Sequence, residues 1–171
     1  MPTIGVSIAV PPPWAQQLQA YREDLGDATA RLIPTHITLV PPLEVSATEL
    51  PAVHEQLART AAEHGPFRIH LRGTGTFRPT SPVVFIALAE GISGCERLAA
   101  GLRHGPLAVE LAFPYHPHVT IAHDLGDAAL DRAFTEQADF ECAFDCDHFW
   151  LYHHIDDIGW EPTARFDLSG R

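Results

Sequence analysis

Two short segments of this 171-residue chain share the pattern histidine, apolar residue, threonine, apolar residue. They are residues 36–39 (His-Ile-Thr-Leu) and residues 118–121 (His-Val-Thr-Ile), about half the chain apart. Imidazole can accept or donate a proton near neutral pH because its unperturbed pKa is about 6.5. A threonine hydroxyl can donate a hydrogen bond to a phosphate oxygen on which charge develops. Two such pairs supply a base, an acid and two neutral donors, which suits phosphoester chemistry without a metal ion.

The positions of these side chains follow from strand geometry. Proline flanks both segments, and both are predicted to be short strands. Side chains alternate along a strand, so His36 and Thr38 share one face, as do His118 and Thr120. The apolar faces are expected to pack against the helices of their own lobe. We therefore predict that the four polar side chains meet in a central cleft and carry catalysis, while the sequence leaves open which histidine is the acid.

The rest of the chain predicts a duplicated unit, because each motif is followed by a helix and then by a strand. The expected strands cover residues 3–10, 36–40, 67–77, 83–89, 108–113, 118–122, 140–144, 149–155 and 163–168; the expected helices cover 14–25, 46–65, 92–102 and 127–138. The fold class is α+β and bilobal: two antiparallel sheets flank a central cleft, with helices outside and βα units related by a pseudo-twofold. Residues 1–171 are expected to form one bilobal domain with one motif per lobe.

Charge and composition restrict the partners. The chain has 11 Lys and Arg against 22 Asp and Glu, a net charge of −11, which excludes a broad basic surface for extended nucleic acid. A small cyclic phosphate or a short RNA end fits this balance better. The apolar start is too short to span a membrane and lacks the basic residues of a signal peptide. We expect a cytoplasmic monomer with no membrane contact, whose three cysteines are reduced packing residues.

The two tetrapeptides resemble the signature motifs of the 2H phosphoesterase superfamily, whose bacterial members are called 2′-5′ RNA ligases or RNA 2′,3′-cyclic phosphodiesterases. The likeness extends through residues 34–42 and 113–122 and through the order of strands and helices. The resemblance implies a bilobal fold with the two histidines and two threonines as the active site. Many RNA-joining relatives carry an arginine just after the second motif. This chain has Ala122-His123-Asp124 there, which predicts a weaker grip on an RNA backbone.

Other residues near the motifs are weaker candidates. Arg78 and Tyr115 could reach a phosphate or a base, and Phe77 could stack on a nucleobase. For Arg78 the alternative is a surface charge, and for the two aromatic residues it is the core. His116 and His118 form a His-x-His pair that could bind a metal ion, but Pro117 interrupts the alternation and no further ligands are identifiable. We therefore expect no metal and no other cofactor.

The sequence predicts a metal-independent phosphoesterase that hydrolyses a cyclic phosphate by paired-histidine acid/base catalysis. The substrate would be a 2′,3′-cyclic RNA end or a small cyclic nucleotide. Three alternatives stay open: a reversible 2′-5′ RNA ligase, a non-catalytic nucleotide-binding module that uses the same cleft, and a histidine-rich metalloprotein.

Overall fold

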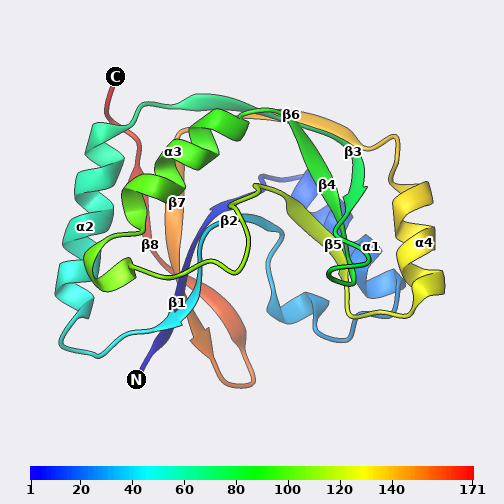
Figure 1. Cartoon of the computed structure of the whole chain (residues 1–171), viewed down its shortest axis with the longest axis horizontal. Coiled ribbons are helices and arrows are strands. Elements are labelled where there is room, and N and C mark those ends of the chain that lie inside the picture. Colours follow the sequence, from blue (N-terminus) through cyan, green and yellow to red (C-terminus); the bar gives the residue numbers. More distant parts are fainter.

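In the computed structural model, which describes residues 1–171, the strands form two antiparallel four-stranded sheets (Figure 1). The sheets have the orders β2-β1-β7-β8 and β5-β4-β3-β6. The strands are β1 (Thr3–Ala9), β2 (His36–Glu44), β3 (Phe67–Thr76), β4 (Val83–Glu90), β5 (Val119–His123), β6 (Glu141–Cys146), β7 (His148–Ile155) and β8 (Gly159–Asp167). The helices are α1 (Trp14–Asp24), α2 (Leu50–Glu63), α3 (Ile92–Leu102) and α4 (Asp127–Glu136). The predicted α+β fold with two antiparallel sheets is confirmed.

The strands that carry the two motifs occupy equivalent places in the two sheets. β2 is an edge strand of the first sheet and β5 is an edge strand of the second. These two edges contact each other, so the motifs meet at the seam between the sheets. The predicted alternation is also confirmed: Ile37, Leu39, Val119 and Ile121 are fully buried, whereas the histidines and threonines between them are only half-buried.

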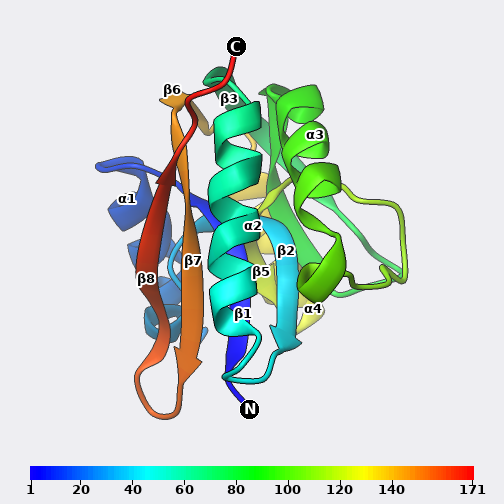
Figure 2. The same ribbon diagram turned by 90° about the vertical axis from the view of Figure 1, so that its left-hand side faces the viewer.

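The helices tie the two sheets together by crossing between them. α1 connects β1 to β2 of the first sheet but packs against β5 of the second, and α3 connects β4 to β5 but packs against β2. α2 lies against β8 (Figure 2), and α4 lies against β3, β4 and β5, so each of these two helices covers the sheet of the strand that precedes it. Each motif strand thus packs against a helix: β2 contacts α3, and β5 contacts α1 and α4. The exchange produces one continuous hydrophobic cluster of 32 buried residues.

Several predicted boundaries differ from the structure: β8, for example, begins at Gly159 rather than at residue 163. Three differences have a local cause. Residues 108–113 form a loop rather than a strand, because the free edge of β4 pairs with β5 instead. β2 continues through Pro41 and Pro42 to Glu44, which an edge strand tolerates since its outer amides need no partner. The second helix starts at Leu50 rather than at residue 46, because Ser46 bonds to the Glu49 carboxylate in the turn before it.

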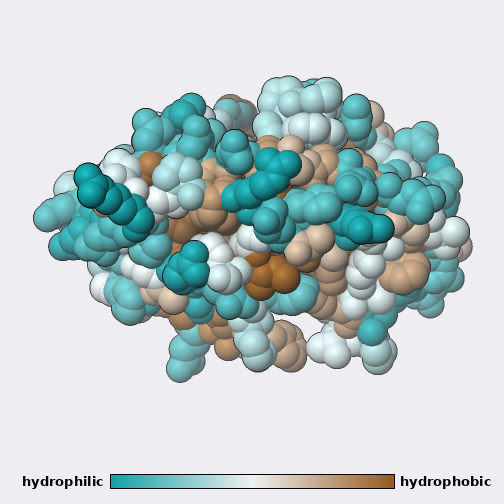
Figure 3. All heavy atoms as spheres, turned by 90° about the horizontal axis from the view of Figure 1, so that it is seen from above, coloured by the Kyte–Doolittle hydropathy of each residue, from teal (hydrophilic) through white to brown (hydrophobic).

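The surface agrees with the acidic composition. Hydrophilic side chains cover most of the face shown in Figure 3, and the apolar areas between them are small. None of the helices is both long enough and apolar enough to cross a membrane. The three cysteines are free and buried, as predicted.

Candidate active site

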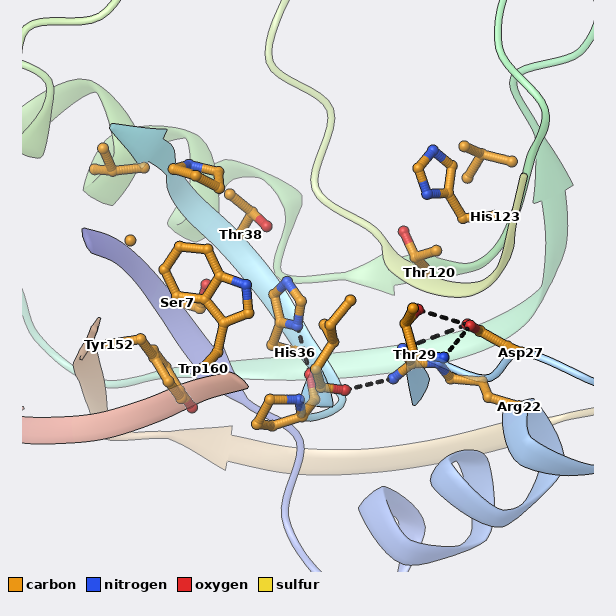
Figure 4. Close-up of a pocket in the computed structure, with 16 residues that line it drawn as sticks. Ser7, Arg22, Asp27, Thr29, His36, Thr38, Thr120, His123, Tyr152 and Trp160 are labelled. Atoms are coloured by element: carbon orange, nitrogen blue, oxygen red, sulfur yellow. Dashed lines mark hydrogen bonds and ion pairs between the residues drawn. The ribbon is translucent and has the colours of Figure 1, made fainter. Parts of the chain in front are cut away.

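A cleft of about 370 Å³ lies along β2, at the seam between the sheets (Figure 4). His36, Thr38 and Thr120 line it together, so the structure brings three of the four predicted motif residues into one cavity. Tyr152 and Trp160 lie on one side of His36, and Arg22, Asp27 and Thr29 lie on the other. The cleft is thus aromatic at one end and charged at the other.

The two motif histidines are held in the same way. The Nδ1 atom of His36 lies 2.6 Å from the carbonyl oxygen of Pro34, and the Nδ1 atom of His118 lies 2.7 Å from that of His116. A carbonyl oxygen only accepts hydrogen bonds, so Nδ1 carries the proton in each ring. The Nε2 atom of each neutral ring is consequently an unprotonated base. Both motifs use the carbonyl two residues upstream to fix this tautomer.

The surroundings of both histidines favour the neutral form. Burial lowers the pKa of His36, the bond to Pro34 opposes this, and the charges of Arg22 and His118 lower the pKa further. Burial also lowers the pKa of His118, against the opposing bond to His116 and with a contribution from the charge of the His116 ring. His118 does not line the cleft itself, but its charge acts on His36. The charge of His118 thus adds to the causes that favour a neutral His36.

An aromatic cluster holds the His118 ring. Phe77 contacts it edge-on, with centroids 4.9 Å apart and an interplanar angle of 89°, and Phe85 lies 5.3 Å away. Gly75 pairs with Phe85 across β3 and β4, and a Cβ atom there would lie only 2.6 Å from the Phe85 ring. The absence of a side chain at Gly75 thus lets Phe85 lie under His118. Phe77, a predicted substrate contact, packs against this histidine.

A third hydroxyl accompanies the two threonines. Ser7 is directly opposite Thr38 in the register of β1 and β2, and it lines the cleft with Thr38 and Thr120. Every fully buried side-chain oxygen in the protein has a hydrogen-bond partner. These three hydroxyls have none within the protein, so they are accessible from the cleft that they line. The sequence held a signal for Ser7, because Gly5 and Ser7 alternate with the apolar Ile4, Val6 and Ile8.

The other two predicted substrate contacts lie outside the cleft. The Tyr115 hydroxyl donates a 2.7 Å hydrogen bond to the carbonyl oxygen of Thr38, and the Arg103 guanidinium lies 5.6 Å from the Tyr115 ring centroid. Tyr115 thereby joins the loop before His118 to the strand that carries His36. Arg78 donates to Thr76 and to the Asp131 carboxylate, at a separate shallow hollow.

Sequence reasoning missed several residues of the cleft. Arg22 comes from α1 and Trp160 from β8, both far from the motifs in sequence. Tyr152 also lines the cleft, and burial raises the pKa of its hydroxyl to about 12. No local pattern marks Arg22 or Trp160, because only the packing of α1 and the pairing of β7 with β8 bring them beside β2.

A sequence model described as the 2′-5′ RNA ligase superfamily matches residues 10–158. The chain belongs to this superfamily. A Geobacillus kaustophilus protein named "Putative phosphoesterase" is 29% identical over 147 residues, which cover 85% of this chain and 84% of the relative. A similarly named protein of Oceanobacillus iheyensis is 28% identical over 145 residues, covering 84% of this chain and 85% of the relative.

The structure is also similar to solved structures of other proteins. One is the Thermus thermophilus protein TT0787, which superposes with a TM-score of 0.70 and 25% identity over the full length of both chains. Escherichia coli LigT, solved in complex with 3′-AMP, has a TM-score of 0.68 and 22% identity and covers 99% of both chains. The likeness to LigT establishes the same fold.

Proposed function

We propose that this protein hydrolyses a cyclic phosphodiester, either a small cyclic nucleotide or the 2′,3′-cyclic end of a short RNA. The observation that carries the proposal is the matched pair of histidines, each with its Nδ1 proton held by a carbonyl and its Nε2 atom free. His36 lines the cleft, and His118 directly precedes β5, whose Thr120 lines the same cleft. The charge of His118 acts on His36. Membership of the 2′-5′ RNA ligase superfamily supports phosphodiester chemistry.

The reaction needs one proton taken and one proton given. The neutral Nε2 atom of one histidine accepts a proton from water, and the resulting hydroxide attacks phosphorus. The bond between phosphorus and one ring oxygen breaks, and the other histidine, in its protonated form, donates its Nε2 proton to that oxygen. The product is a phosphate monoester beside a free hydroxyl. The hydroxyls of Thr38 and Thr120 bind the nonbridging oxygens on which charge develops.

The structural neighbours support a nucleotide-sized ligand. LigT has been solved with 3′-AMP, with ATP and with phosphate. A 3′-monophosphate is one of the two products that opening a 2′,3′-cyclic phosphate ring can leave. The net charge of −11 adds a repulsive background for long nucleic acids, which favours small substrates here.

The first test is hydrolysis of 2′,3′-cyclic mononucleotides in the presence of a chelator. We expect turnover with chelator to equal turnover without it, because two imidazoles supply proton transfer and the hydroxyls supply charge stabilisation. Product formation is measured by chromatography, which also shows whether a 2′- or 3′-monophosphate forms.

The controls separate the competing functions. RNA halves with a 2′,3′-cyclic end and a free hydroxyl are incubated in parallel, and joining without hydrolysis would indicate a ligase. Tight binding with no product after long incubation would indicate a binding module. Activity that is lost with chelator and restored by divalent ions would contradict the metal-independent mechanism.

Ser7 provides a second test of the cleft chemistry. If its hydroxyl assists Thr38 in binding a phosphate oxygen, Ser7→Ala should lower kcat/KM by roughly tenfold. This is less than the usual cost of removing a donor to the transition state, because a water molecule can take the place of the hydroxyl. Steady-state kinetics on the same cyclic nucleotide measures this, with Ser93→Ala on the exposed side of α3 as the matched control. Unchanged kinetics in Ser7→Ala would remove Ser7 from the site.

A further inference from the structure

The cleft contains a cationic group that the proposed reaction does not use. Arg22 is the only lysine or arginine among the residues that line the cleft, in a chain with an excess of acidic residues. It projects from α1, and only 4% of its surface is exposed. A buried guanidinium is costly unless it has partners, and it stays charged at neutral pH. Its partners are therefore informative.

The protein satisfies only part of this guanidinium. One terminal nitrogen donates a 2.7 Å hydrogen bond to the carbonyl oxygen of Ile33. The other terminal nitrogen is 3.9 Å from the nearest Asp27 oxygen, which is too long for a hydrogen bond. A guanidinium has five N–H donors. Since no buried nitrogen lacks a partner, the nitrogen atoms without a hydrogen bond to protein open onto the cleft.

Asp27 is positioned as a counter-charge rather than as a tight partner. Its Oδ1 atom accepts hydrogen bonds from the amide and the hydroxyl of Thr29, at 2.9 and 2.7 Å. Only Oδ2 faces Arg22, at the long distance given above. The arrangement holds the guanidinium charged and leaves room for a second anion to reach its free donors.

The position of Arg22 matches the shape of a nucleotide. His36 lies between Arg22 on one side and Tyr152 and Trp160 on the other (Figure 4). In a nucleoside, the base at C1′ and the 5′ carbon at C4′ share one face of the ribose but leave from opposite ends of the C1′–C2′–C3′–C4′ edge. The 2′ and 3′ oxygens lie between these two ends, on the other face. A cyclic phosphate at His36 with its base toward the aromatic end directs its 5′ oxygen toward Arg22.

We propose that Arg22 binds a phosphate group on the 5′ oxygen of the nucleoside whose 2′,3′-cyclic phosphate is opened at His36. This inference rests on the proposed function and specifies its substrate class: a cyclic phosphate that carries a second phosphate. Two sources have this chemistry, a free 5′-phosphorylated mononucleotide and the internucleotide phosphate of an RNA end.

The test compares three substrates: a nucleoside 2′,3′-cyclic phosphate, the same compound with a 5′-phosphate, and a dinucleotide with a 2′,3′-cyclic end. We expect the 5′-phosphate to raise kcat/KM by about tenfold to a hundredfold, the range for hydrogen bonds to charged groups. The result is expressed as the kcat/KM for the 5′-phosphorylated cyclic nucleotide divided by that for the unphosphorylated one. Both values come from one protein sample, so the fraction of active protein cancels. A preference for the dinucleotide over the 5′-phosphorylated mononucleotide would identify RNA ends as the source.

The variants change the ratio in opposite directions. Arg22→Met should bring the ratio close to one, and Arg22→Lys should give an intermediate value because it keeps the charge but loses the planar donors. Asp27→Asn retains the Oδ1 acceptor for Thr29 and removes the competing charge, so it should raise the ratio. Arg97→Met on the exposed face of α3, where Arg97 bonds only to Ser93, is the matched control and should not change it.

A binding experiment keeps the two proposals distinguishable. Calorimetric titration of wild type with a nucleoside 3′-phosphate and a nucleoside 3′,5′-bisphosphate should show tighter binding of the bisphosphate, whether or not the protein turns over. Failure to hydrolyse any cyclic phosphate would refute the proposed function alone. Equal affinity for the two ligands, or a substrate ratio that Arg22→Met and Asp27→Asn leave unchanged, would overturn the role of Arg22 and reduce it to a support for Ile33.

Discussion

Replacing His36 or His118 with alanine is expected to lower kcat/KM for a cyclic nucleotide by about two to four orders of magnitude. Each substitution removes one of the two Nε2 atoms that transfer protons, and a positioned general acid or base contributes about 10²–10⁴-fold. The carbonyls of Pro34 and His116 lose only a hydrogen-bond donor at a half-buried position, so the fold should persist. Steady-state kinetics with circular dichroism on the same samples measures both effects.

The double variant and a control make this prediction specific. Groups that act as a unit are strongly non-additive, so His36→Ala with His118→Ala together should cost little more than the more damaging single change. His70→Ala, which removes an imidazole paired with Glu141 outside the cleft, should leave kcat/KM near wild type. Near wild-type turnover in the folded double variant would refute paired-histidine catalysis.

Local sequence patterns predicted the part of the fold that depends on short-range geometry. The alternation in residues 36–39 and 118–121 is a property of any strand, so the buried and open faces of β2 and β5 followed directly. The repeat of motif, helix and strand predicted two related units, and the motif strands β2 and β5 do take equivalent edge positions in the two sheets. The strands that follow them, β3 and β6, instead pair with each other in the second sheet.

The features that the sequence did not predict depend on long-range packing. The pattern of residues 108–113 is compatible with a strand, but β5 occupies the edge that this segment would need. Arg22 reaches the cleft only because α1 crosses to the second sheet, and no periodicity in α1 reports that crossing. Phe77 and Tyr115 were identified as residues near the motifs, yet their contacts are with the His118 ring and the Thr38 carbonyl.

The pH at which kcat/KM is highest should be lower than for two histidines with ordinary pKa values. Catalysis needs one histidine neutral and the other protonated, so kcat/KM follows a bell whose low-pH limb reports protonation of the base and whose high-pH limb reports loss of the acid proton. Burial lowers the pKa of both His36 and His118 below the usual value of about 6.5. Both limbs therefore move to lower pH, and kcat/KM should peak below about pH 6.5 and fall by about tenfold per unit well above the peak.

Bound substrate should raise the pKa values of the two histidines again, so the pH profile of kcat provides a second, independent test. A phosphate anion beside both rings stabilises the imidazolium form, so the profile of kcat should lie at higher pH than that of kcat/KM. Stability must be followed over the same pH range. His36 and His118 have lowered pKa values in the folded protein, so just below about pH 6.5 they bind more protons in the unfolded chain than in the folded one. The free energy of unfolding therefore falls as the pH decreases through this range. Circular dichroism at each pH separates this loss from the protonation of the base. A kcat/KM peak above about pH 7.5 in folded protein would contradict two desolvated histidines as the acid and the base.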